Sequence, residues 1–187
     1  MSRPNWFVAL PLPATAGWQQ AAATAPEALR RFAAADLHCT VAFLGPCGEE
    51  RALAAWQALR DQPLAALLVS AGGWRGLGPS RQPSAYGLTF AEGRQPLEQL
   101  LVQAGGRALQ AAGCPPSAHA PLPHITLLRP RRREAAQWCE PMQQWMQTAP
   151  LPPEPALLQE LALYTWSEDR RERLFQIVRS RPLPPPT

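Results

Sequence analysis

The chain has 187 residues, 46% of them apolar, which is enough to bury one core of ordinary size. All 18 basic residues are arginine, against 14 acidic residues, and the net charge of +4 tolerates an anionic ligand but does not by itself indicate a nucleic-acid-binding protein. No segment approaches the ~20 consecutive apolar residues of a membrane span, and the N-terminal apolar run is too short for a signal peptide. We therefore expect a cytoplasmic monomer without a membrane contact.

The first third of the chain predicts a strand, a helix and a second strand. Residues 6–10 are apolar and followed by proline, as in a buried strand. In residues 15–32 apolar side chains recur every three or four positions, which predicts a helix that Pro26 kinks or delays. Residues 37–44 alternate with a period of two, which is typical of a strand.

The middle of the chain predicts two further helices, each followed by strands. Helical spacing of leucine and tryptophan alternates here with short apolar runs and with loops rich in glycine and proline. The predicted helices are 49–60 and 95–112, the predicted strands are 64–77, 84–91 and 122–129, and the last strand follows an irregular connection at 113–123.

The last part predicts a helix at 134–147 that is broken near Pro141, and then strands at 156–166 and 174–181. Helices interleaved with hairpin-like strand pairs indicate an α+β fold with mainly antiparallel sheet. We expect residues 1–181 to form a single domain and residues 182–187 to form a proline-rich tail without packed structure.

A His-x-Thr pattern occurs on two of the predicted strands. His38 is followed by Thr40 and His124 by Thr126, although the chain has only three histidines. With the threonine content of this chain, two such pairs arise by chance with a probability of roughly 0.5%. Because side chains two apart on a strand share a face, each histidine has its threonine beside it. This repeat hints at an internal duplication, with two pseudo-symmetric lobes.

The pair of motifs has the groups that cleavage of a phosphodiester needs. Two imidazoles with ordinary pKa values near ~6.5 can be one neutral and one protonated, as general base and general acid require. The threonine hydroxyls can donate to the non-bridging phosphate oxygens. The alternative is that both histidines are ordinary sheet residues and both threonines simple strand formers, but packing gives no reason for the repeated spacing.

Other polar residues have simpler interpretations. His119 lies in the proline-rich connection without a threonine partner, and we expect a solvated loop residue. The run Arg131–Arg133 fits a solvated turn better than a substrate contact. The four cysteines form no C-x-x-C pair, which argues against a structural zinc site and a disulfide framework, so free thiols are expected. We also expect no cofactor.

The residues around both motifs resemble the signatures of the 2H phosphoesterase family. The relevant segments are Leu37–Gly45 (LHCTVAFLG) and Pro123–Arg129 (PHITLLR). The opening strand Trp6–Pro11 and the C-terminal strands around Leu161–Tyr164 and Leu174–Val178 are also similar to those of the family. Within the family, the chain is most similar to the bacterial and archaeal RNA 2′,3′-cyclic phosphodiesterases, historically called 2′-5′ RNA ligases.

The resemblance implies a bilobal fold in which two mainly antiparallel sheets, flanked by helices, surround a central cleft. It implies a hydrolase that opens a 2′,3′-cyclic phosphate to a 2′-phosphomonoester without a metal. The substrate would be an RNA end, a small cyclic nucleotide or an ADP-ribose cyclic phosphate, and the reverse reaction would be 2′-5′ ligation. His38 would donate the proton to the leaving 3′ oxygen, His124 would activate water, and Thr40, Thr126 and Arg129 would bind the substrate.

Some positions depart from the family pattern or leave alternatives open. Strand alternation places Phe43 opposite His38, so we expect a core residue. The tryptophan that relatives often carry before the central helix is absent, and Tyr86 is the aromatic residue in that region. The absence of lysine argues against a long RNA substrate. A competing hypothesis is an RNA-end binding or regulatory module that has kept the fold without turnover.

Overall fold

The computed structural model describes residues 3–131, 134–171 and 173–185. Its α-helices are α1 (Glu49–Arg60), α2 (Arg94–Leu100), α3 (Gly106–Ala111) and α4 (Cys139–Thr148). Its strands are β1 (Trp6–Pro11), β2 (Arg30–Arg31), β3 (His38–Gly45), β4 (Leu67–Val69), β5 (Ala71–Leu77), β6 (Ala85–Phe90), β7 (His124–Arg129), β8 (Ala156–Leu158), β9 (Glu160–Trp166) and β10 (Phe175–Pro182).

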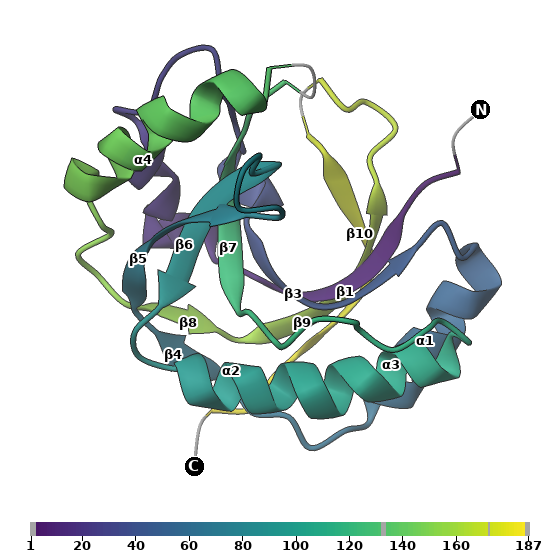
Figure 1. The fold of residues 1–187 in the computed structure, drawn as a ribbon. Coiled ribbons are helices and arrows are strands. Elements are labelled where there is room, and N and C mark those ends of the chain that lie inside the picture. The colour runs from purple at the N-terminus through teal and green to yellow at the C-terminus, as the bar shows by residue number, and fades with distance from the viewer. Residues whose placement is uncertain (1–2, 132–133, 172, 186–187) are drawn as a thin grey trace.

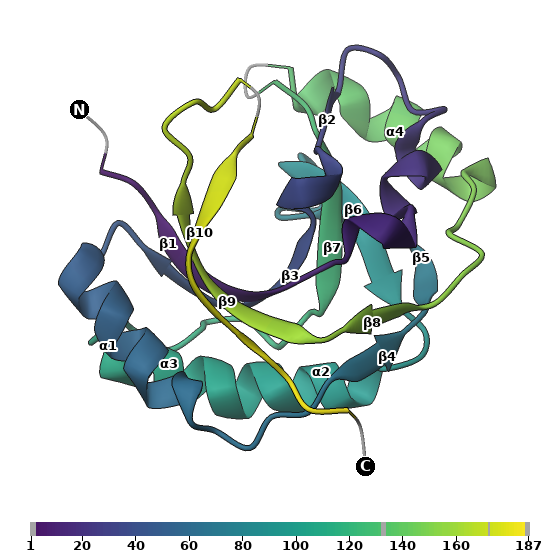
Figure 2. The same cartoon turned by 180° about the vertical axis from the view of Figure 1, so that it is seen from behind.

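Most strands belong to one antiparallel sheet, in which the path β10-β9-β1-β3-β7-β6-β5 is extended by β2 beside β7 (Figures 1 and 2). Strands β4 and β8 form a separate antiparallel pair. In the described part of the chain, β3 and β7 share one register pair, Cys39 with Ile125, so the large sheet consists of two well-paired blocks joined at a narrow seam. These antiparallel sheets and their flanking helices confirm the predicted α+β class.

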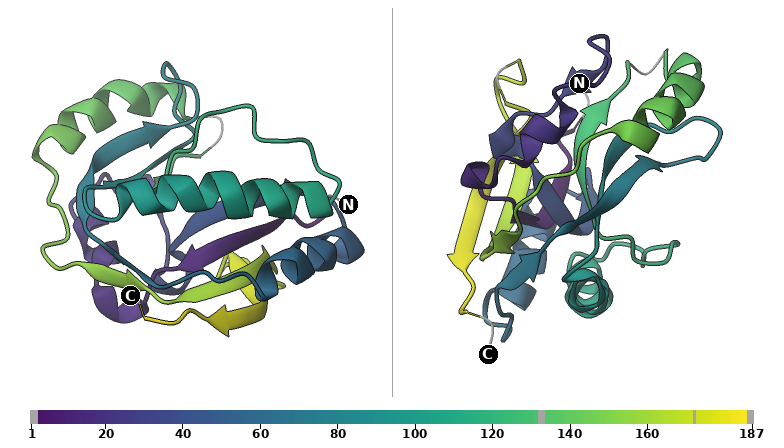
Figure 3. Two further views of the ribbon diagram at one scale, coloured as in Figure 1. Left: turned by 90° about the horizontal axis from the view of Figure 1, so that it is seen from below. Right: turned by 90° about the vertical axis from the view of Figure 1, so that its left-hand side faces the viewer.

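Helices α1, α2 and α3 lie together on one side of the strands, and α4 lies at the end of the molecule that holds β5 and β6 (Figures 1 and 2). The main core fills the helix side of the sheet, where Leu97, Leu59 and Ala108 are fully buried. A smaller cluster of Phe7 and Tyr164 with small neighbours lies apart from this core. The seam between the two blocks is consequently covered on its helix side (Figure 3).

The predicted helix at 15–32 is wrong, although its apolar stripe is buried. The segment folds into 3₁₀ helices at Ala14–Ala16 and Trp18–Ala22, a turn, and strand β2. Gly17 separates the two 3₁₀ helices in a left-handed conformation, with φ of 70°. Pro26 then prevents continuation, because proline lacks the amide donor that an α-helix uses.

A β-bulge corrects the expectation for Phe43. Strand β3 carries an extra residue, Val41, between the positions that pair with Ala9 and Val8 of β1. The extra residue reverses the alternation, so Phe43 points to the same side as His38 and is 59% exposed. Gly105, in the π-helical turn between α2 and α3, lies against this bulge, because a Cβ there would be 2.5 Å from the Val41 carbonyl oxygen.

The C-terminal segment is more ordered than a free tail. Strand β10 continues to Pro182, and the amide of Leu183 donates to the Gln159 carbonyl oxygen at 2.8 Å. The Leu183 side chain is buried, and the Pro184 carbonyl accepts a hydrogen bond from the Ala66 amide. Residues 182–184 are therefore packed against the preceding strands. Among the described residues, no helix is long and apolar enough to cross a membrane.

Candidate active site

The seam between β3 and β7 brings the two His-x-Thr motifs together. Because Cys39 pairs with Ile125 in an antiparallel register, His38 lies beside Thr126, and Thr40 lies beside His124. Cys39 and Ile125 face the core and are fully buried, so the four polar side chains point to the opposite side. All four line one cavity of about 320 Å³.

Both histidine rings are anchored to the backbone in the same way. The Nδ1 atom of His38 lies 2.7 Å from the Asp36 carbonyl oxygen, and Nδ1 of His124 lies 2.7 Å from the Leu122 carbonyl oxygen. A carbonyl oxygen can only accept, so Nδ1 carries the proton in each neutral ring. The Nε2 atoms are then left to exchange protons with a ligand in the cavity.

His38 is surrounded by aromatic side chains. Its ring stacks on Phe7 with centroids 4.7 Å apart and lies edge-on to Phe175 at 5.4 Å, with Tyr164 at 5.3 Å. Burial in these surroundings, reinforced by the nearby His124, lowers the pKa of His38 to about 4, against the raising effect of the Asp36 carbonyl. In the ligand-free protein, His38 is therefore neutral at pH 7.

Phe7, Tyr164 and Phe175 form an aromatic wall around His38, and Asp36 helps to hold this wall in place. Sequence analysis did not identify Asp36. Its carboxylate is buried and accepts hydrogen bonds from the Leu174 amide at 3.0 Å and the Phe175 amide at 3.2 Å. The same residue provides the carbonyl oxygen that anchors the His38 ring. Asp36 thus connects the start of β3 to the start of β10, a contact between segments far apart in the sequence that no local pattern reveals.

His124 has a more open environment than His38. Burial lowers its pKa, the positive charge of Arg75 lowers it further, and the Leu122 carbonyl opposes both. On the side away from His38, His124 and Thr40 also border a second cavity of about 610 Å³. This cavity lies between β3, the α2–α3 helical segment and the 113–123 connection, and Phe43 lines both cavities.

The two threonines are half-buried beside the histidines. Among the described residues, neither the Thr40 nor the Thr126 hydroxyl makes a hydrogen bond within the protein. Both hydroxyls are therefore available to donate to an anion between the rings. The sequence-predicted cluster of two histidines and two threonines is present as one group.

Arg129 lies at the other end of the first cavity, three residues beyond Thr126 on β7. Its guanidinium lies over the Phe32 ring, 5.6 Å from the centroid. Of the basic run that follows, Arg131 forms an ion pair with Glu134, and Arg132 and Arg133 lie outside the described residues. Arg129 thus borders the same cavity as the histidines.

The two cavities are lined by further aromatic residues and by His119, whereas Tyr86 is buried away from them. Phe43 is exposed on the cavity wall, contrary to the prediction of a core residue, and Trp166 also lines the first cavity. Tyr86 is buried and donates to the Trp138 carbonyl oxygen, so it is unavailable for stacking. His119 is exposed and lines the second cavity. The Phe43 position depends on the bulge, which a strict period of two cannot predict.

Within the described residues, no group of three or more His, Cys, Asp or Glu side chains is arranged to hold a metal ion. Cys39, next to His38 in sequence, faces the core, and burial raises the pKa of its thiol to about 12. A cysteine–histidine pair in the manner of a cysteine protease is therefore not formed at this position.

The fold is similar to that of several solved structures. E. coli LigT complexed with NADP+ is 25% identical, with a TM-score of 0.71 over 98% of this chain and 99% of that chain. E. coli LigT complexed with 3'-AMP is 26% identical, with a TM-score of 0.72 over 97% of this chain and 99% of that chain. A structure described as a phosphoesterase is 25% identical, with a TM-score of 0.73 over 98% of this chain and 99% of that chain.

The sequence comparisons found no further match: no protein-family model and no curated protein matches this chain. The relation to known proteins therefore rests on structures that extend over nearly the whole chain.

Proposed function

Because the chain has the LigT-like fold of the 2H phosphoesterases, as its motifs indicated, we propose that it hydrolyses 2′,3′-cyclic phosphates to 2′-phosphomonoesters. The fold supports an activity of the phosphoesterase or ligase type. The observation that carries the more specific proposal is the reciprocal register of β3 and β7, which places two backbone-anchored imidazoles and two threonine hydroxyls on one cavity. A phosphodiester between the two rings would contact a base, an acid and hydroxyl donors together.

In the proposed reaction, Nε2 of His124 accepts a proton from water as the water oxygen attacks phosphorus. The bond from phosphorus to the 3′ oxygen breaks, and His38 gives its Nε2 proton to that oxygen. The product is a 2′-phosphomonoester, with the proton count balanced between the two histidines. Thr40 and Thr126 would donate to the non-bridging oxygens, where charge increases in the transition state.

The low pKa of His38 is compatible with its role as acid once the substrate is bound. In the free protein His38 is neutral, because burial lowers its pKa to about 4. A phosphate anion beside the ring stabilises the imidazolium form and raises this pKa. The substrate thus helps to create the acid that protonates its own leaving group.

The second cavity supports the proposal that the substrate carries a nucleoside. It is lined largely by apolar residues, and the exposed Phe43 ring stands at its junction with the first cavity, which holds the histidines and is called the catalytic cavity below. Such a ring can stack on a base without reading its sequence. Nucleotide binding is also supported by the similar structures, which are described as E. coli LigT complexed with NADP+, ATP and 3'-AMP.

The proposal is tested with adenosine 2′,3′-cyclic phosphate and a short RNA that ends in a 2′,3′-cyclic phosphate, each incubated with the protein in EDTA. We expect release of a 2′-phosphomonoester by the wild type and strong loss of turnover in His38→Ala and in His124→Ala. Circular dichroism and thermal melting of the variants verify the fold. A folded wild type that binds these compounds without converting them would instead identify a binding module.

A further inference from the structure

Two arginines, Arg129 and Arg170, line the catalytic cavity, and a third, Arg30, lies beside them. Arg30 of β2 is the cross-strand partner of Arg129 of β7. Arg170, in the loop between β9 and β10, lies near both, since its positive charge and that of Arg30 each contribute to the lowered pKa of Arg129, after burial. We refer to Arg30, Arg129 and Arg170 as the arginine triad.

The arrangement of the arginine triad is electrostatically unfavourable in the free protein. Like charges directly opposite on neighbouring strands are destabilising. In the described part of the chain, no member of the triad forms an ion pair with a carboxylate. The Asp169 carboxylate, in the same loop as Arg170, accepts hydrogen bonds from the backbone amide and the guanidinium of Arg171 at 3.0 to 3.1 Å.

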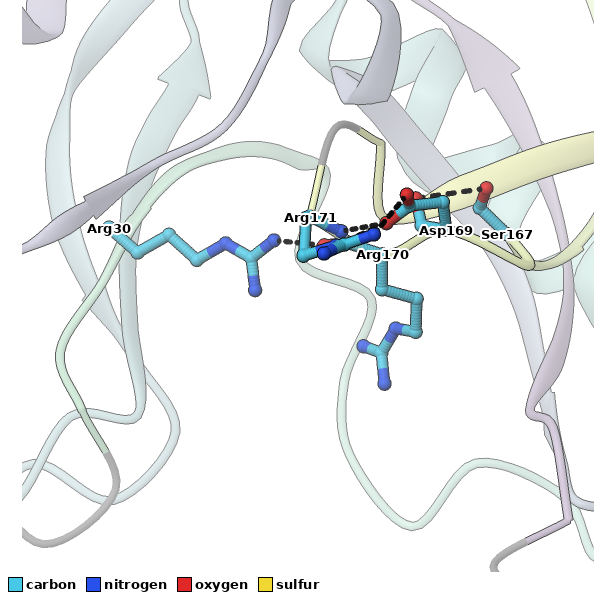
Figure 4. A network of polar contacts seen from close by, with 5 residues as sticks. All are labelled: Arg30, Ser167, Asp169, Arg170 and Arg171. Carbon is cyan, nitrogen blue, oxygen red and sulfur yellow. Dashed lines mark hydrogen bonds and ion pairs between the residues drawn. The ribbon is translucent and has the colours of Figure 1, made fainter.

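The backbone and two aromatic rings hold the triad in this arrangement. The Arg30 guanidinium donates to the Arg170 carbonyl oxygen at 2.8 Å, which fixes the loop beside β2 (Figure 4). In the same view the Arg170 side chain points away from the pair formed by Arg171 and Asp169. The Arg170 guanidinium lies over Trp166, 4.3 Å from the ring centroid, as that of Arg129 lies over Phe32. Stacking of this kind orients the planar donors but leaves their edges free.

The triad adjoins the catalytic cavity. Arg129, Arg170 and Trp166 line the same cavity as His38 and His124. An anion attached to the scissile phosphate by a short linker can therefore reach the arginines while the phosphate stays between the histidines. Guanidinium groups bind phosphate through paired, charge-assisted hydrogen bonds, so phosphate is the anion that best fits this cluster.

We propose that the arginine triad binds a second phosphate of the substrate, namely the 5′-phosphate of the nucleotide that carries the cyclic phosphate. This inference rests on the proposed function and specifies its substrate class: a 5′-phosphorylated nucleotide or the last nucleotide of an RNA chain. A nucleoside 2′,3′-cyclic phosphate without the 5′-phosphate would occupy only part of the site.

The shape of a ribose fits this assignment. The base is attached at C1′ and the 5′ carbon at C4′, on the same face of the ring but at opposite ends of the edge that carries the cyclic phosphate. With the cyclic phosphate at the histidines, a base toward Phe43 and the second cavity places the 5′-phosphate toward the triad. The 3′ oxygen, which is nearer the 5′ carbon, then faces His38, because His38 lies beside Thr126 on the triad side of the seam.

The test compares adenosine 2′,3′-cyclic phosphate with its 5′-phosphorylated form, using the ratio of their kcat/KM values. We expect the wild type to favour the 5′-phosphorylated substrate about tenfold or more, as one charge-assisted phosphate contact would give. Arg30→Gln and Arg170→Gln should each lower this ratio toward one. Arg179→Gln, which removes an equal charge from the exposed part of β10, should leave the ratio unchanged. Raising the salt concentration should reduce the wild-type ratio.

A binding measurement separates the failure of this inference from the failure of the proposed function. Isothermal titration calorimetry compares adenosine 2′,5′-bisphosphate with adenosine 2′-monophosphate, which requires no turnover. A wild type that hydrolyses neither substrate but still prefers the bisphosphate, with the preference lost in Arg170→Gln, refutes the proposed reaction and supports the second phosphate site. Equal affinities for the two ligands, or ratios that the triad variants do not alter, would refute the site.

Discussion

The two His-x-Thr strands have the same local pattern and different surroundings. Both rings are anchored through Nδ1 to the carbonyl oxygen two residues earlier, at 2.7 Å. His38, however, is enclosed by Phe7, Tyr164 and Phe175, whereas His124 borders an open apolar cavity. The short motif therefore determines the position and tautomer of each ring, and distant packing determines how readily each ring takes up a proton.

In the proposed reaction this asymmetry would separate the roles of acid and base, because two identical imidazoles would exchange roles freely. The aromatic enclosure disfavours a charge on His38 until an anion arrives, and the open side of His124 leaves room for ligand and water. The predictions below test whether the two halves act as one catalytic unit with different environments.

The largest effect is expected from removing the imidazoles. His38→Ala and His124→Ala should each lower kcat by roughly 10²–10⁴, the usual contribution of a general acid or base. Because the two rings act in one concerted step, the double variant should lose little more than the worse single variant. Single-turnover assays with the cyclic phosphate measure the rates of the two single variants and the double variant. Multiplicative losses would show that the rings act independently.

A smaller loss is expected for the threonines. Thr40→Val and Thr126→Val each remove one hydroxyl donor while preserving shape, and kcat should fall by about 10- to 100-fold. KM should change less than kcat, because the donors contact charge that increases in the transition state. Thr148→Val at the end of α4 is the matched control and should leave kcat and KM unchanged. An effect on KM alone would assign the hydroxyls to ground-state binding.

The pH dependence should reveal the shared proton. The reaction needs one protonated and one neutral ring, and in the free protein the pKa of His38 is about 4 while that of His124 is lowered from 6.5. As pH rises through this range both rings become neutral, so kcat/KM should already fall below pH ~6.5, by up to about tenfold per pH unit. Bound phosphate raises the pKa values, so the alkaline limb of kcat should lie at higher pH. A kcat/KM plateau that extends beyond pH 8 would contradict this assignment.

The smallest effect is expected from a substitution in the aromatic wall around His38, which should change the pKa of that ring. Phe7→Leu removes the ring that stacks on His38 and admits water, so the pKa of His38 should rise toward its ordinary value while that of His124 changes little. NMR titration of the two imidazole signals measures both values in one experiment. Equal shifts at both rings would mean that the wall does not distinguish the halves.

Sequence analysis predicted the elements that depend on local pattern. Helix α1 was predicted with its observed bounds, and period-two alternation correctly paired His38 with Thr40 and His124 with Thr126. Local pattern failed where an inserted residue or a proline changed the geometry. The bulge at Val41 reversed the side of Phe43, and the 15–32 stripe formed 3₁₀ helices and turns instead of an α-helix.

The remaining parts of the site depend on contacts between distant segments. Asp36 accepts hydrogen bonds from the amides of Leu174 and Phe175, and Arg30 donates to the Arg170 carbonyl oxygen across the contact between β2 and the β9–β10 loop. No periodicity in the sequence encodes these contacts. They explain why the grouping of the two histidines and two threonines was predictable and its surroundings were not.

The place of β1 in the large sheet has a consequence for how the protein is made. Strand β1 is buried between β3, which follows it closely in sequence, and β9, whose Tyr164 pairs with Phe7. During synthesis on the ribosome, one edge of this apolar strand stays open until about 150 further residues have been translated, and such long-range pairing slows folding. The nascent chain therefore has an unpaired, aggregation-prone strand edge for most of its synthesis, and a chaperone that shields this edge should raise the yield of folded protein.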